Sequence, residues 1–210
     1  MKIIVNIPSS INDITLFQYQ KFFDIYDEKA DPEFINRMAL SIFYEIEGKY
    51  YSQMKVTDIE KIVSELNKAL SQKIKLVNRF ELHGVEYGLI PDFDDMTFGE
   101  FTDLDNNTEL DKMHRLMSIL YRPITNKQGN RYEIEPYSGT SDKLLGMPLG
   151  VALSCMDFFF NIALQLTSDT LKSLEVEDPA AMEKLTLARS GVGTLQSIPY
   201  RVGMLPNLIV

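Results

Sequence analysis

The chain has 210 residues, of which 45% are hydrophobic, and a formal net charge of -9 at pH 7. This apolar content is enough to build a core, so the composition excludes an intrinsically disordered chain. The charge disfavours direct binding to nucleic acid, because affinity for a phosphate backbone comes mainly from clustered Lys and Arg. The 21 Lys and Arg residues are scattered along the sequence.

Two similar capping signals predict the starts of two helices. Thr15 is followed three residues later by Gln18, and Thr97 is followed in the same way by Glu100. Each pair matches a capping box, in which the two side chains bond to each other's backbone N–H groups. Apolar residues before each threonine and at the fourth helical position complete a hydrophobic staple. Both segments are therefore expected to be helical.

Other signals extend the helical prediction along the chain. Asp31-Pro32 fits the cap and first position of a helix that we expect to end at Gly48. Thr57 begins a third capping box and opens an amphipathic helix. Thr108 is expected to cap a helix that stops before Pro123, because proline disfavours helical geometry in the preceding residue.

Strand signals occur in two places. Residues 79–91 alternate roughly between apolar and polar on both sides of Gly84, which predicts a β-hairpin. Residues 124–137 contain a second turn between two short strands, which are expected to join the first hairpin in a small antiparallel sheet beside the helices. The expected fold class is mainly α, a helical domain with a small antiparallel β-sheet or hairpin and therefore minor α+β character.

The longest apolar segment covers residues 149–166, which approaches the length of a membrane span. Asp157, Asn161 and Gln165 form a polar stripe along it, and a charge near the centre of a span is costly. We expect a core or interface helix with no membrane insertion. Asp178-Pro179 predicts one more helix start.

The C-terminal residues differ from the rest of the chain. We predict a single helical domain over residues 1–190 and an irregular apolar tail over residues 191–210, in which Arg201 is the only charge. The tail packs either on its own domain or on a partner chain, and the sequence leaves both alternatives open. Its candidate partner-binding residues are Tyr200, Met204, Leu205, Leu208, Ile209 and Val210.

The sequence offers little catalytic or metal-binding chemistry. His83, His114 and Cys155 are the whole inventory of His and Cys, and they lie far apart in the chain. We expect a turn residue, a helix-surface residue and a buried thiol. Residues 103–107 resemble the start of a calcium loop, but Thr108 stands where such a loop requires glycine. A connection between helices is the preferred interpretation.

No reaction follows from the remaining motifs. Asp92, Asp94 and Asp95 precede a predicted helix, where the helix dipole stabilises carboxylates without any catalytic role. The sequence has neither a Gly-x-Ser-x-Gly elbow nor a Gly-Lys-Ser/Thr phosphate loop. No catalytic, cofactor-binding or metal-binding residue is assigned, and we expect neither an enzyme nor a bound cofactor.

Several segments together resemble a family of small proteins from tailed bacteriophages. This family includes proteins of crAss-like phages and of other phages of Bacteroidetes, and its genes lie among those for virion morphogenesis. The similarity extends from about residue 7 to residue 160. The matching pieces are residues 7–16 with 18–20, residues 79–80 with 84–88, residues 96–101, residues 120–123 and residues 135–137.

The resemblance implies a non-enzymatic role in virion assembly. The preferred interpretation is a tail-assembly chaperone that binds an aggregation-prone virion protein in the host cytoplasm. The alternative is a structural component of the virion, such as a connector, tail or packaged cargo protein. An uncharacterised hydrolase is the third and least favoured class. The implied partners are tail or connector proteins, with no membrane or direct nucleic-acid contact, and homo-oligomer formation is left open.

Overall fold

The computed structural model describes residues 7–26 and 31–173, with side chains described as far as residue 162. Within these residues the α-helices are α1 (Leu16–Ile25), α2 (Pro32–Tyr44), α3 (Gly48–Tyr51), α4 (Val56–Leu70), α5 (Phe98–Asn106), α6 (Met113–Leu120) and α7 (Leu149–Ser173). Short 3-10 helices are η1 (Ile11–Asp13), η2 (Leu110–Lys112) and η3 (Asp142–Gly146). The strands are β1 (Arg79–Leu82), β2 (Val85–Leu89), β3 (Tyr121–Gln128) and β4 (Arg131–Ile134).

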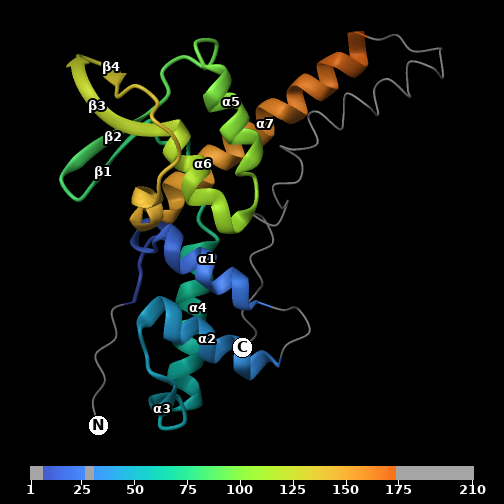
Figure 1. Ribbon diagram of the computed structural model, residues 1–210. Helices are drawn as coiled ribbons and strands as arrows, with labels where there is room; N and C mark the ends of the chain where they lie inside the picture. The colour runs from blue at the N-terminus through green and yellow to red at the C-terminus, as the bar shows by residue number, and fades with distance from the viewer. Residues whose placement is uncertain (1–6, 27–30, 174–210) are drawn as a thin grey trace.

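The elements separate into two groups with α1 between them. Figure 1 shows α2, α3 and α4 at one end of the molecule, and the sheet with α5 and α6 at the other. The start of α7 contacts η1 and α1. Two backbone hydrogen bonds fix this contact, from Leu16 to the carbonyl of Met147 (2.9 Å) and from Leu149 to the carbonyl of Ile14 (2.8 Å). The entry to α1 is therefore attached to the entry to α7.

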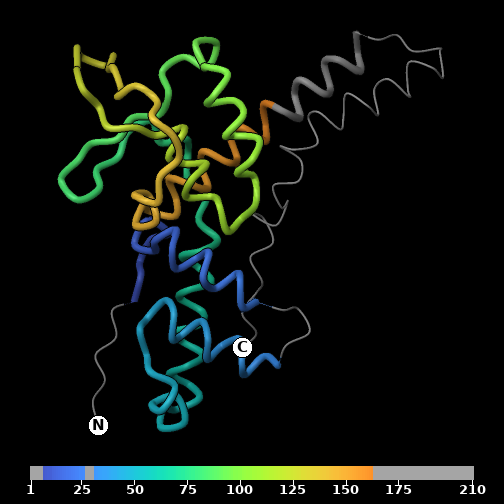
Figure 2. Tube along the Cα trace, viewed as in Figure 1, coloured from blue at the N-terminus to red at the C-terminus, as the bar shows by residue number. Residues whose placement is uncertain are grey.

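The four strands form one antiparallel sheet in the order β1-β2-β3-β4. His83 and Gly84 connect β1 to β2 with φ values of 53° and 77°, as expected for a tight two-residue hairpin turn. Figure 2 shows both strand pairs leaving the same side of the molecule. Tyr132 of β4 lies over Gly88 of β2, and its hydroxyl donates to the carbonyl of Leu89 (2.8 Å).

The expected mainly helical class is confirmed in its broad feature, and the sheet is larger than a single hairpin. Both predicted strand pairs form, and β3 lies beside β2, so they join into one sheet. The prediction that both segments share one small antiparallel sheet is confirmed. The predicted boundary between residues 190 and 191 lies outside the described residues.

Three predicted helix ends are wrong in detail. The helix α4 begins at Val56 after Lys55, so Thr57 lies inside the helix and does not cap it. The helix α2 ends at Tyr44 rather than Gly48, because Glu45 adopts a left-handed conformation with φ of 55°. Thr108 caps no helix, since Glu109 precedes η2.

The core is shared among the helices, with α1, α2, α4, α6 and the start of α7 all contributing buried apolar side chains. Tyr19 and Phe22 are 1% and 2% exposed, and Phe22 packs against Phe43 of α2 with ring centroids 5.3 Å apart. Cys155 of α7 is fully buried, and burial raises the pKa of its thiol to about 12. The predicted buried and unreactive thiol is therefore confirmed.

The helix α7 carries the predicted polar positions at its surface. Asp157 and Asn161 are exposed, whereas the side chain of Gln165 lies outside the described residues. In the described part of the chain, no helix combines the length and apolar character that a membrane crossing requires. The helix predicted after Asp178-Pro179 also lies outside the described residues.

Candidate protein-binding surface

The outward face of α5 carries two exposed aromatic side chains. Phe98 is 85% exposed and Phe101 is 64% exposed, and they stand one turn apart on the same helix. A large aromatic side chain is normally a main contributor to a core, so such exposure calls for a physical cause. The cause lies in the residue between them.

Glu100 holds the opposite side of α5 in the interior. Its side chain is 4% exposed and pairs with Arg122 of β3, with Nη2 and Oε1 2.8 Å apart. The other carboxylate oxygen accepts hydrogen bonds from the backbone N–H of Thr97 (2.7 Å) and from its hydroxyl (2.6 Å). The predicted capping box is confirmed, and the same glutamate also makes a buried ion pair.

Helical geometry then determines where the aromatic residues point. Each residue turns about 100° around the helix axis, so Phe98 faces about 160° and Phe101 about 100° away from Glu100. Neither ring can reach the core while Glu100 remains on Arg122. Of the two residues of the predicted staple, Met96 packs against the core, whereas Phe101 is 64% exposed.

Neighbouring contacts reinforce this orientation. The Tyr137 hydroxyl donates to the Asp103 carboxylate, and the Arg122 guanidinium lies 5.9 Å from the centre of the Tyr137 ring. Burial, together with the bond to Asp103, raises the pKa of Tyr137 above its ordinary range. Asn107 donates to the backbone carbonyl of Asp103 (2.7 Å) at the end of α5. The inner side of α5 is thus held by other segments at Glu100 and at Asp103.

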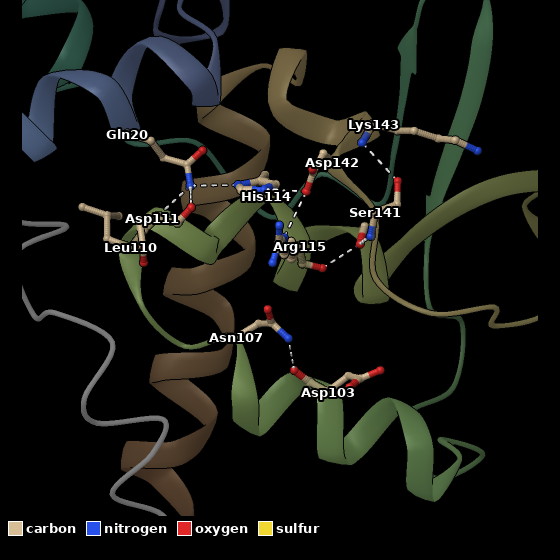
Figure 3. Close-up of polar contacts among 11 residues, drawn as sticks. Gln20, Asp103, Asn107, Leu110, Asp111, His114, Arg115, Ser141, Asp142 and Lys143 are labelled. Carbon is tan, nitrogen blue, oxygen red and sulfur yellow. Dashed lines mark hydrogen bonds and ion pairs between the residues drawn. The ribbon is translucent and has the colours of Figure 1, made fainter.

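A second polar cluster joins α1, α6 and η3 (Figure 3). The Gln20 amide nitrogen donates to the carbonyls of Leu110 (2.7 Å) and Asp111 (2.8 Å) and lies 3.1 Å from His114 Nδ1. His114 Nε2 lies 3.0 Å from Asp142 Oδ1, so the two ring nitrogens connect α6 to α1 and to η3. The side chain of His114 is only 12% exposed, so the predicted surface position is wrong.

This cluster contains no activated nucleophile. The Ser118 hydroxyl accepts from the backbone N–H of Ser141 (2.9 Å) and donates to the carbonyl of Arg115 (2.7 Å). Arg115 and His114 both bond to Asp142, and these bonds hold the pKa of its carboxyl below the ordinary value. The side chains bind backbone groups and each other across three elements, so we interpret the cluster as a structural junction. Asp142 is 28 residues from His114, and no local sequence signal connects them.

The other predicted positions are not brought together. His83 is the expected turn residue between β1 and β2, with φ of 53°. Residues 103–107 are helical up to residue 106 and do not form a calcium loop. No group of three or more metal-ligating side chains occurs among the residues that the structure describes. The carboxylate of Asp92 accepts a hydrogen bond from the backbone of Asp94 (3.0 Å), which is an ordinary turn contact.

The predicted partner-binding residues all belong to the C-terminal tail and lie outside the described residues. They are Tyr200, Met204, Leu205, Leu208, Ile209 and Val210. Sequence analysis did not identify the α5 face, because a phenylalanine in an amphipathic helix is usually assigned to the core. The helical spacing of Glu100 between Phe98 and Phe101 was the available signal. Searches of protein-family models, curated proteins and solved structures gave no match to this chain.

Proposed function

We propose that this protein is a non-enzymatic assembly factor of a tailed phage, and specifically a tail-assembly chaperone that acts in the host cytoplasm. In this role it binds an aggregation-prone virion protein until assembly. The binding surface is the outward face of α5, centred on Phe98 and Phe101. The observation that carries the proposal is the pair of aromatic side chains held in water by a buried ion pair on the other side of their helix.

The physical argument concerns the free energy of exposing these rings. Burying one such side chain on binding contributes about 1.5–3 kcal/mol, which makes Phe98 and Phe101 strong candidates for contact hot spots. Because Glu100 and Arg122 fix the helix beforehand, little conformational entropy is lost when a partner binds. A surface of this kind suits repeated, reversible protein binding.

The phage assignment comes from the sequence resemblance. One of the segments that carry this resemblance contains the start of α5. The segment Met96-Thr97-Phe98-Gly99-Glu100-Phe101 is one of the pieces that resemble the phage family. It contains both exposed rings and the glutamate that orients them.

The test compares partner capture by matched variants during infection. The double variant Phe98→Ser/Phe101→Ser should lose the virion protein that the unaltered chain crosslinks in infected cells. Phe17→Ser is the matched control, because Phe17 is 50% exposed near the start of α1. Equal capture by the double variant and by the unaltered chain would remove the α5 face from the proposal.

Two further measurements separate the chaperone from the alternative. Mass spectrometry of purified virions should not detect the protein if it is a chaperone, whereas abundant copies would support a structural virion component. Deletion of residues 203–210 tests the predicted tail. Unchanged capture after this deletion would indicate that the tail packs on its own domain and does not bind the partner.

A further inference from the structure

The aromatic face of α5 is accompanied by negative charge along the helix. Asp105 stands four residues after Phe101 and seven after Phe98, so it shares their face. Asp94 and Asp95 are exposed in the segment before the helix. Within residues 7–26 and 31–162, none of these three carboxylates forms a salt bridge.

The stability of α5 explains only part of this charge. Carboxylates before a helix are favourable, because the N-terminal end of the helix dipole is positive, and Asp94 and Asp95 fit that rule. Asp105 stands in the last turn, where the dipole is negative and a carboxylate is unfavourable. The helix has no basic residue in that turn to offset it. The position of Asp105 therefore opposes helix stability and favours a cation in contact with the same face.

We infer that the partner segment bound by α5 is apolar in its centre and carries Lys or Arg at its ends. This inference rests on the proposed function and names the chemistry of the segment that the chaperone would bind. Its apolar centre covers Phe98 and Phe101, and its cations meet Asp95 and Asp105. Complementary charge of this kind raises the association rate and selects the partner.

Two other occupants fit this charge less well. The tail over residues 191–210 is apolar, but Arg201 is its only charge against three carboxylates. A second copy of the chain carries a net charge of -9 and would bring like charges together. A basic segment of another protein matches both the apolar and the charged parts of the surface.

The first experiment measures binding of three labelled helical peptides to the full-length chain by fluorescence anisotropy. One peptide has a leucine and alanine centre with lysines at both ends. The second has glutamates at both ends, and the third keeps the lysines but replaces the leucines by serine. The first peptide should bind tightest, and addition of salt should weaken its binding. Equal binding of the lysine and glutamate peptides would overturn the inference.

Variants of the chain locate the contact. Asp95→Asn/Asp105→Asn should weaken binding of the lysine peptide by about 3- to 10-fold, as expected for two partly exposed ion pairs. Phe98→Ser/Phe101→Ser should abolish it, and Phe17→Ser should leave it unchanged. Unaltered binding by the aspartate double variant would contradict the charge complementarity.

A photo-crosslinking residue at position 98 of the full-length chain tests the other occupants. Capture of the lysine peptide supports the inference, whereas crosslinks to residues 191–210 or to a second copy that persist in its presence would overturn it. Failure of the inference is distinct from failure of the proposed function. A chain that captures its virion partner in infected cells but binds all three peptides equally retains the function and loses this partner chemistry.

Discussion

The helices α1 and α5 begin with the same local signal and expose opposite faces. Thr15 and Gln18 form a complete capping box at α1, as Thr97 and Glu100 do at α5. The fourth residue of α1, Tyr19, is 1% exposed, whereas the fourth residue of α5, Phe101, is 64% exposed. The capping box therefore determines where each helix begins and does not determine which side is buried.

The third helical residue accounts for the difference. Gln18 is neutral and donates to the carbonyl of Ile42 (3.2 Å) at one edge of α1, which leaves the apolar face free to pack. Glu100 is charged, and its charge requires a buried cation, so the whole of α5 is oriented toward Arg122. The ion pair between Glu100 and Arg122 thus determines which side of α5 is buried, and it leaves both phenylalanines exposed.

Alanine substitution of one aromatic residue on each helix should show the largest difference, because the ring on α1 is buried and the ring on α5 is exposed. Phe22→Ala on α1 is expected to lower the free energy of unfolding by about 3–5 kcal/mol, because it leaves a cavity beside Phe43. Phe98→Ala on α5 should change it by less than about 0.5 kcal/mol, because the ring is 85% exposed. Urea denaturation measures both values, and similar costs would contradict the comparison.

Breaking the ion pair should produce the next largest effect. Arg122→Met leaves the Glu100 carboxylate buried without its cation, and the expected cost is about 3 kcal/mol. Adding Glu100→Gln should recover most of that loss, since no uncompensated charge then remains. A cost below about 1 kcal/mol for Arg122→Met would mean that the pair behaves as a surface contact.

Two glycines provide a smaller test of how each helix is held. A Cβ on Gly150 of α7 would lie 2.3 Å from Ile74 Cδ1 and 2.9 Å from Ile11 Cγ2, so Gly150→Ala should cost about 1–3 kcal/mol and loosen the entry to α1. A Cβ on Gly99 of α5 would meet no neighbouring atom within 4 Å. Gly99→Ala should therefore stabilise the helix by about 0.5–1 kcal/mol. Thermal unfolding compares the two, and destabilisation by Gly99→Ala would show that the outer face of α5 is packed.

Acid should affect α5 and leave the α1 cap unchanged. Although burial raises the pKa of Glu100, the hydrogen bonds from Thr97 and the charge of Arg122 outweigh it and hold that pKa below the ordinary value of 4.5. Since the pKa is lowered in the folded state, this stabilisation is present above pH 4.5 and is lost as the pH falls through the lowered value.

Glu100→Gln is the matched variant for this pH dependence, because Gln18 already occupies the same position in α1. Denaturation midpoints measured from pH 7 downward should converge for the variant and the unaltered chain at acid pH. Parallel curves over the whole range would contradict a role for the Glu100 charge.

Local sequence signals predicted the starts of α1, α2 and α5, the hairpin turn at Gly84 and the buried Cys155. Those features depend on residues a few positions apart. The orientation of α5 depends on Arg122, which is 22 residues away from Glu100 in the sequence, and the junction at His114 depends on Asp142. Pairings of this kind are set by the fold, so periodicity and capping rules do not reveal them.

The most direct test of the central claim is a paired measurement on Phe98→Ser/Phe101→Ser. Its free energy of unfolding and its capture of the proposed virion partner are compared with those of the unaltered chain. We predict an unfolding free energy within about 1 kcal/mol of the unaltered value, together with loss of capture. Retained capture, or a loss of stability as large as that expected for Phe22→Ala, would contradict the claim that these rings are exposed in order to bind a partner.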